Sequence, residues 1–121
     1  MNTNSADNGG AFWRHFDTLL TAHKVVIDRP AGSVHPRYPD YVYPHDYGYL
    51  EGTSAADGNG IDVWVGTLAQ RNLVAVICTV DMVKHDTEVK LLLGCTPQEM
   101  RRILAQHNTT MQGGLLIERP G

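Results

Sequence analysis

Residues 24–65 read KVVIDRPAGSVHPRYPDYVYPHDYGYLEGTSAADGNGIDVWV, and this is the most informative stretch of the chain. It contains the frame YPHDYGY over 43–49 and, a short loop later, the glycine-rich acidic turn DGNGID over 57–62. Glycine adopts backbone conformations that other residues resist, so such a turn can bring Asp57 and Asp62 together. Converging carboxylates suit a hard divalent cation, and the upstream tyrosine hydroxyls can bind an anion held by that cation. The stretch therefore indicates a site for a metal ion and a phosphate.

The acidic turn has a second interpretation. Asp-Gly-Asn-Gly is also a common solvent-exposed turn, and in isolation Asp57 and Asp62 favour that simpler reading. The metal interpretation depends on what surrounds them.

Composition limits the classes of function. At 121 residues the chain is long enough for one domain with a modest core. Its 42% hydrophobic and 19% charged residues are typical of a soluble globular protein. The net charge of −3 argues against a nucleic-acid surface, and no apolar run is long enough to span a bilayer. We therefore expect no nucleic-acid or membrane partner.

The cysteines and the N-terminus indicate a compartment. Cys78 and Cys95 lie in apolar segments and are predicted to be reduced core residues rather than a disulfide. The polar stretch 1–10 lacks the charged and apolar regions of a signal peptide. These features favour a cytoplasmic protein.

Periodicity predicts a chain that is mainly β with a helix near each end. The first helix is expected over 11–23, and the second over 97–107, where Thr96 and Glu99 form a capping box. Alternating or β-branched runs predict seven short strands, over 25–27, 41–43, 47–50, 62–65, 73–83, 89–93 and 115–117.

These elements predict an α+β fold, mainly β, in which a small OB-like closed β-barrel is flanked by the two helices. The strands 73–83 and 89–93 are expected to pair as a hairpin through the turn at 85–87. Residues 1–10 are predicted to be a disordered tail, and 11–121 a single domain.

The 24–65 segment resembles the first half of the soluble, Mg²⁺-dependent inorganic pyrophosphatases of family I. That family carries a strand ending in an acidic residue, then Tyr-Pro-x-x-Tyr-Gly-Tyr, then Asp-Gly-Asp-Pro-hydrophobic-Asp. The corresponding segments here are 25–28, 43–49 and 57–62. The hairpin sequence DTEVK over 86–90 resembles the family's second acidic cluster, which ends in acid-x-Lys.

The resemblance implies Mg²⁺-dependent hydrolysis of inorganic pyrophosphate to phosphate, with other divalent cations as possible replacements for Mg²⁺. It implies a small phosphate-containing substrate and a homo-oligomer. The residues that it assigns to metal binding are Asp57, Asp62, Asp86, Glu88 and Asp28. Those that it assigns to phosphate binding are Arg37, Tyr47 and Lys90, and those that it assigns to catalysis are Asp57, Asn59, Asp62 and Tyr43.

Departures from the family pattern keep other functions open. Asn59 stands where the family has an Asp that helps to accept a proton from the attacking water, and general-base catalysis typically contributes roughly 10²–10⁴-fold. After His107 the family's Tyr-Lys phosphate clamp is missing. The alternatives are a non-catalytic relative that binds Mg-phosphate or a nucleotide, and a hydrolase of another phosphate compound. His45 is expected to be a surface loop residue, with a substitute base as the sharper alternative.

Overall fold

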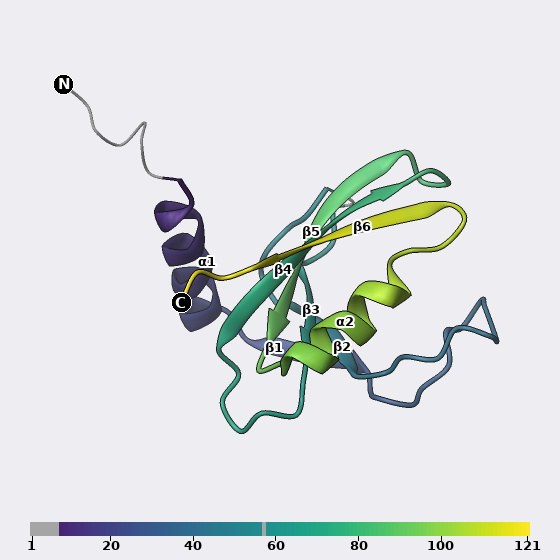
Figure 1. Ribbon diagram of the computed structural model, residues 1–121, viewed down its shortest axis with the longest axis horizontal. Helices are drawn as coiled ribbons and strands as arrows, with labels where there is room; N and C mark the ends of the chain where they lie inside the picture. Colours follow the sequence, from purple (N-terminus) through teal and green to yellow (C-terminus); the bar gives the residue numbers. More distant parts are fainter. Residues whose placement is uncertain (1–7, 57) are drawn as a thin grey trace.

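The computed structural model describes residues 8–56 and 58–121, so Asp57 and the stretch 1–7 lie outside the described residues. It contains two helices, α1 (Gly10–Ala22) and α2 (Pro97–Gln106) (Figure 1). The six strands are β1 (Val25–Arg29), β2 (Asp46–Leu50), β3 (Asp62–Val65), β4 (Leu73–Asp81), β5 (Asp86–Leu93) and β6 (Gln112–Glu118).

The six strands form one sheet in the order β1-β2-β3-β5-β4-β6. The β3–β5 pair is parallel, and the other neighbours are antiparallel. The predicted hairpin is present as β4 and β5. An α+β fold that is mainly β is confirmed. Within the described residues no ladder joins β1 to β6, so the sheet is open and the predicted closed barrel is not confirmed.

The sheet separates two hydrophobic cores, because successive side chains of a strand point to opposite faces. Leu91 and Leu93 of β5 belong to the core that contains Trp13 of α1. Leu92 belongs to the other core, with Ile103 of α2. The two helices thus cover opposite faces of the sheet, and the side chains of residues 88, 90 and 92 share the α2 face.

The predicted strand over 41–43 does not join the sheet. Val42 instead forms an isolated bridge with Val34 in a long arm over 30–45. The arm contains four prolines, and proline cannot donate a ladder hydrogen bond. Two contacts hold the arm and its end against α2. Gln106 Nε2 donates to the Val42 carbonyl at 3.0 Å, and Arg102 Nη1 lies 2.9 Å from His45 Nε2.

Trp13 is the buried residue of α1, whereas Phe12 is exposed. The Arg119 guanidinium lies over the Trp13 ring and forms a bidentate ion pair with Asp17. The C-terminal strand is thereby tied to α1.

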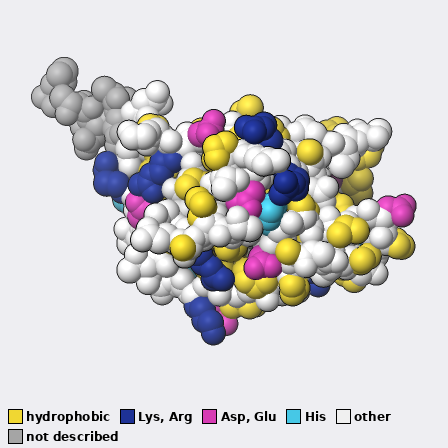
Figure 2. Space-filling view, turned by 60° about the horizontal axis from the view of Figure 1, so that its bottom comes forward, with side chains coloured by type: hydrophobic (Ala, Val, Ile, Leu, Met, Phe, Trp, Pro, Cys, Tyr) yellow, Lys and Arg dark blue, Asp and Glu magenta, His cyan; other side chains and the backbone are white. Residues whose placement is uncertain are grey.

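Three further observations concern the thiols, the helices and one face of the surface. Cys78 and Cys95 are free thiols, as predicted. No helix within the described residues has the length and hydropathy needed to cross a membrane. On the face shown in Figure 2, acidic and basic side chains are interspersed with apolar ones.

The capping box at the start of α2 is confirmed and extends beyond the helix. Glu99 accepts hydrogen bonds from the Thr96 backbone N–H and also from the N–H and hydroxyl of Thr67, in the loop after β3. Burial raises the pKa of Glu99, but these hydrogen bonds outweigh burial and lower the pKa to about 2. One buried carboxylate therefore both begins α2 and fixes its position on the sheet.

Replacing Glu99 by Gln should lower the free energy of unfolding at pH 7 by about 1–3 kcal/mol, as expected when hydrogen bonds to a charged group are lost. Because folding lowers the pKa of Glu99, its contribution is present above about pH 4.5 and disappears as the pH falls towards 2. Urea unfolding of both proteins from pH 7 to pH 3 should show the difference narrowing below pH 4.5. Glu118→Gln, at an exposed position of β6, is the control. Equal stabilities of the wild type and Glu99→Gln at pH 7 would refute this role.

Candidate functional site

Lys90 lies at the centre of the candidate site. Its side chain comes from β5, is 6% exposed, and reaches Asp62 of β3 and Tyr47 of β2. The Lys90 Nζ lies 2.7 Å from Asp62 Oδ2, 2.9 Å from the Tyr47 hydroxyl and 3.9 Å from Glu88 Oε1. One buried ammonium therefore connects three adjacent strands and contacts two carboxylates.

The YGY frame places Tyr47 in this cluster. Val26 of β1 passes so close to Gly48 that a Cβ at position 48 would collide with the Val26 carbonyl oxygen. Only glycine fits there, and the tyrosine before it projects to the α2 face against Trp64, with ring centroids 4.6 Å apart. Burial is the main cause that raises the pKa of Tyr47 well above its ordinary value, and the nearby Asp62 carboxylate adds to it. The hydroxyl of Tyr47 is therefore neutral.

The turn before Asp62 is tightly packed. A Cβ at Gly60 would lie 2.8 Å from the Leu50 carbonyl oxygen and 2.9 Å from the Tyr49 ring. The absence of a side chain at Gly60 therefore permits this close packing. The Thr53 hydroxyl accepts the Ile61 N–H and donates to the Leu50 carbonyl, which fixes the chain just before Asp62.

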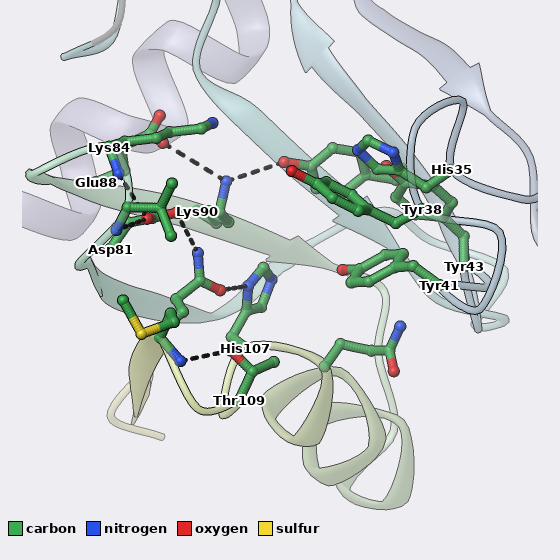
Figure 3. Close-up of a pocket in the computed structure, with 15 residues that line it drawn as sticks. His35, Tyr38, Tyr41, Tyr43, Asp81, Lys84, Glu88, Lys90, His107 and Thr109 are labelled. Atoms are coloured by element: carbon green, nitrogen blue, oxygen red, sulfur yellow. Dashed lines mark hydrogen bonds and ion pairs between the residues drawn. The ribbon is translucent and has the colours of Figure 1, made fainter.

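A pocket of about 310 Å³ opens beside Lys90 on the α2 face (Figure 3). It is bounded by the arm over 30–45, the tip of the β4–β5 hairpin, the end of α2 and the loop that leads to β6. Its lining residues are His35, Tyr38, Tyr41, Tyr43, Tyr47, Asp81, Val83, Lys84, Glu88, Lys90, Gln106, His107, Thr109, Met111 and Gln112. Burial is the main cause that raises the pKa of Tyr41 to about 12, so this hydroxyl is neutral as well.

A chain of hydrogen bonds runs from the core to the rim of the pocket. Trp64 Nε1 donates to His107 Nε2 at 2.9 Å, and His107 Nδ1 lies 2.9 Å from Gln112 Oε1. The Gln112 amide then donates to Asp81 Oδ2 at 3.2 Å. Because an indole N–H can only donate, Nε2 must accept and the Nδ1 proton must point to Gln112. Burial is the main cause that lowers the pKa of His107 to about 4, consistent with a neutral ring.

The structure brings part of the predicted site together. Tyr43, Tyr47, Glu88 and Lys90 line the pocket. Asp62 does not line it but lies directly behind Lys90, to which it is hydrogen bonded.

The other predicted residues lie elsewhere. Arg37 and Asn59 are exposed and do not line this pocket. Asp28 is the exposed extra residue of a bulge in β1, where the register with β2 shifts. Asp86 also lies outside the lining, although its Oδ1 is buried without a hydrogen-bond partner. The role of Asp57 cannot be placed, since it lies outside the described residues.

The pocket also contains functional groups that sequence reasoning missed. Asp81 was placed inside a strand over 73–83, but β4 ends at this residue. Its Oδ1 accepts the N–H groups of Val83 and Lys84 and so forms the hairpin turn. An Asp between an apolar run and a polar segment is a recognisable signal for such a turn. His107 was treated only as the end of a helix, and local sequence carries no signal for its contact with Trp64.

His45 differs from both interpretations of it. The residue is 6% exposed, so the expected surface position is wrong. It lies under α2 with Arg102 Nη1 at 2.9 Å and Glu99 Oε2 at 3.8 Å, and it does not line the pocket. Burial is the main cause that lowers its pKa. His45 packs the arm against the helix.

The donor set was compared with the needs of a divalent cation. Asp62 and Glu88 supply carboxylate oxygens, which are the ligands that Mg²⁺ prefers. Within residues 8–56 and 58–121, no group of three or more His, Cys, Asp or Glu side chains is arranged to hold a metal. The described residues therefore offer two carboxylates of suitable chemistry beside Lys90, and no third ligand of these residue types joins them.

The buried, neutral state of His107 predicts a specific loss of stability in acid. Because folding lowers its pKa from 6.5 to about 4, the unfolded chain takes up a proton below pH 6.5 that the folded protein does not. Stability should fall by up to about 3 kcal/mol as the pH drops through this window, and His107→Gln should abolish that component. The measurement is urea unfolding between pH 7.5 and pH 4. The control is His15→Gln, at an exposed position of α1. Parallel pH profiles for the wild type and His107→Gln would contradict the assignment.

Comparisons with known proteins agree with this architecture. A family model described as Inorganic Pyrophosphatase matches residues 13–114. An inorganic pyrophosphatase from Neisseria gonorrhoeae has a similar fold, with a TM-score of 0.57 and 20% identity over 74% of this chain and 77% of that one. The inorganic pyrophosphatase from Helicobacter pylori gives a TM-score of 0.52 and 16% identity over 78% of this chain and 81% of that one.

At these identities the two structures show a shared fold only. No curated protein sequence matches the chain. The family model, however, spans all of the sheet except the end of β6 and includes the Lys90 cluster. On that match, the chain is a member of the inorganic pyrophosphatase family.

Proposed function

We propose that this protein hydrolyses inorganic pyrophosphate to phosphate with the help of Mg²⁺. The observation that supports the proposal most directly is the cluster of Tyr47, Asp62, Glu88 and Lys90 at one end of the pocket. It combines a cation for phosphate oxygens with carboxylates suited to a divalent metal. Family membership supports the same reaction class.

Asp62 and Glu88 are the residues that would hold the metal, with Asp57 as a third ligand. Asp28 and Asp86 remain candidates for outer metal sites. A bound divalent cation would neutralise charge on the phosphate and lower the pKa of water. Other divalent cations of similar hardness are alternatives to Mg²⁺.

The protein's own groups would act on the substrate. Lys90 would exchange part of its contact with Asp62 for a phosphate oxygen, and the neutral Tyr47 hydroxyl would donate to phosphate. Tyr43 is 6% exposed and packs against the Tyr47 ring with centroids 5.4 Å apart, so it would hold Tyr47 in place. Arg37 would contribute only by moving towards the pocket from its exposed position in the arm.

A second candidate function is binding of a phosphate compound without hydrolysis. Asn59 favours it, because an amide does not accept a proton as the family's carboxylate does. The ion pair of Lys90 with Asp62 also favours it, because the ammonium already neutralises one of the metal-binding carboxylates. We further propose a cytoplasmic homo-oligomer, supported by the two free thiols and by family membership.

The proposal predicts release of phosphate from pyrophosphate by the purified protein in excess Mg²⁺. Asp62→Asn preserves the shape of the side chain but removes its charge, and it should abolish the release. Asn59→Asp should raise turnover, by up to about 10²-fold, if a missing proton acceptor limits the rate. The measurement is a colorimetric phosphate assay, and Asp40→Asn, at an exposed position of the arm, serves as the control.

Release that persists in Asp62→Asn would place the activity elsewhere. If the wild type and Asn59→Asp are both folded and neither releases phosphate, hydrolysis of pyrophosphate is excluded and the binding function becomes the better account.

The metal site has a test that does not depend on turnover. Lys90→Met leaves the Asp62 and Glu88 carboxylates without their shared cation and should destabilise the protein by about 3 kcal/mol. Mg²⁺ can replace the lost charge, so it should stabilise Lys90→Met more than the wild type in urea unfolding. Lys84→Met removes an exposed lysine of the same pocket and should show no such excess. An equal effect of Mg²⁺ on all three proteins would argue against metal binding at these carboxylates.

A further inference from the structure

The pocket has two chemically different walls (Figure 3). Asp81, Lys84 and Glu88 lie on one side, Lys90 lies between the walls, and the other side is aromatic. The aromatic wall consists of His35, Tyr38, Tyr41 and Tyr43, all from the arm over 30–45. Tyr43 supports Tyr47 in the proposed phosphate site, but the proposed hydrolysis uses none of His35, Tyr38 and Tyr41, so these three rings require their own explanation.

The aromatic wall is held in place by its backbone. The His35 N–H donates to the Tyr41 carbonyl, and the Arg37 N–H donates to His35 Nδ1 at 3.0 Å. The His35 ring lies 4.8 Å from the Tyr38 ring and is stacked on Tyr43 with an interplanar angle of 12°. These contacts bring the rings together into one continuous surface.

One ring of the aromatic wall, Tyr38, faces solvent at the mouth of the pocket beside two apolar side chains. Tyr38 is 60% exposed, and Val83 and Met111, which also line the pocket, are 68% and 48% exposed. Aromatic faces stack planar rings, and a methionine thioether makes favourable contacts with them. Pyrophosphate has no group that could use this apolar mouth.

The size and charge of the pocket also favour a ligand larger and less polar than pyrophosphate. A volume of about 310 Å³ lies at the lower end of the range for pockets that enclose organic ligands, which is about 300–1,000 Å³. Among the lining residues, the two lysines Lys84 and Lys90 are balanced by the two carboxylates Asp81 and Glu88. His35 and His107 add little positive charge near neutral pH, because burial is the main cause that lowers the pKa of both. Such a pocket favours a ligand whose phosphate charge is accompanied by an apolar part.

We propose that this pocket binds a phosphate compound that carries a planar aromatic ring, of the nucleoside diphosphate type. The ring lies against the His35–Tyr38 surface, and the phosphates lie at Lys84 and Lys90. The placement of the phosphates rests on the proposed function, whereas the placement of the ring rests on the aromatic wall alone.

The test is calorimetric binding of ADP, pyrophosphate and adenosine in the presence of Mg²⁺. ADP should bind at least about fivefold more tightly than either fragment, because stacking of one base on an aromatic side chain is typically worth about 1–3 kcal/mol. Tyr38→Ala should weaken ADP binding at least fivefold more than pyrophosphate binding, and Tyr38→Phe should restore it. Phe12→Ala, which removes an exposed ring from α1, should change neither affinity.

Three results would overturn the inference. These are an ADP affinity no higher than that of pyrophosphate, an ADP affinity unchanged in Tyr38→Ala, and adenosine binding as tight as that of ADP. If adenosine binds as tightly as ADP and Lys90→Met does not change the ADP affinity, the phosphate site on which the proposed function depends is also excluded. Tight ADP binding that depends on Tyr38, without phosphate release from pyrophosphate, would exclude the hydrolysis and support the ring subsite.

Discussion

The buried ammonium of Lys90 is the interaction on which the candidate site depends. It is bonded to Asp62 and Tyr47, so three neighbouring strands meet at one charge. A buried lysine without such partners would be costly, since an unpaired charge loses its hydration without compensation. In the fold this charge satisfies the carboxylate of Asp62, and under the proposed function the same ammonium would also bind phosphate.

Lys90 reaches the site because successive side chains of β5 point to opposite faces of the sheet. Lys90 and Leu92 point to the α2 face of β5, whereas Leu91 and Leu93 point to the α1 face. One strand thereby supplies the buried ammonium of the site and apolar side chains to both cores. The hydrogen-bond chain from Trp64 through His107 and Gln112 then connects the core of the α2 face with the hairpin turn at Asp81. These hydrogen bonds therefore connect the rim of the pocket to the core.

The sequence predicted those features that local chemistry determines. The capping box at Glu99 and the β4–β5 hairpin follow from short motifs. A family pattern assigned Tyr47 and Lys90 to one site, but their direct contact spans 43 residues and was not predicted. The open sheet, the arm over 30–45 and the burial of His45 do not, because each depends on contacts between residues far apart in the chain. Asp81 was missed for a local reason, since its apolar neighbours extended the expected strand beyond the residue that ends it. His107 was missed because its partner, Trp64, lies 43 residues away.

We propose that Lys90, Asp62 and Glu88 form a site for phosphate and metal, and a crystal structure with Mg²⁺ and methylenediphosphonate would test this directly. In this ligand the bridging oxygen is replaced by carbon, so it is not hydrolysed. We expect a metal ion on the Asp62 and Glu88 carboxylates, with Lys90 Nζ turned from Asp62 towards a phosphonate oxygen. An ammonium that keeps its bond to Asp62, with the metal and the phosphonate absent from the pocket, would contradict the proposed site.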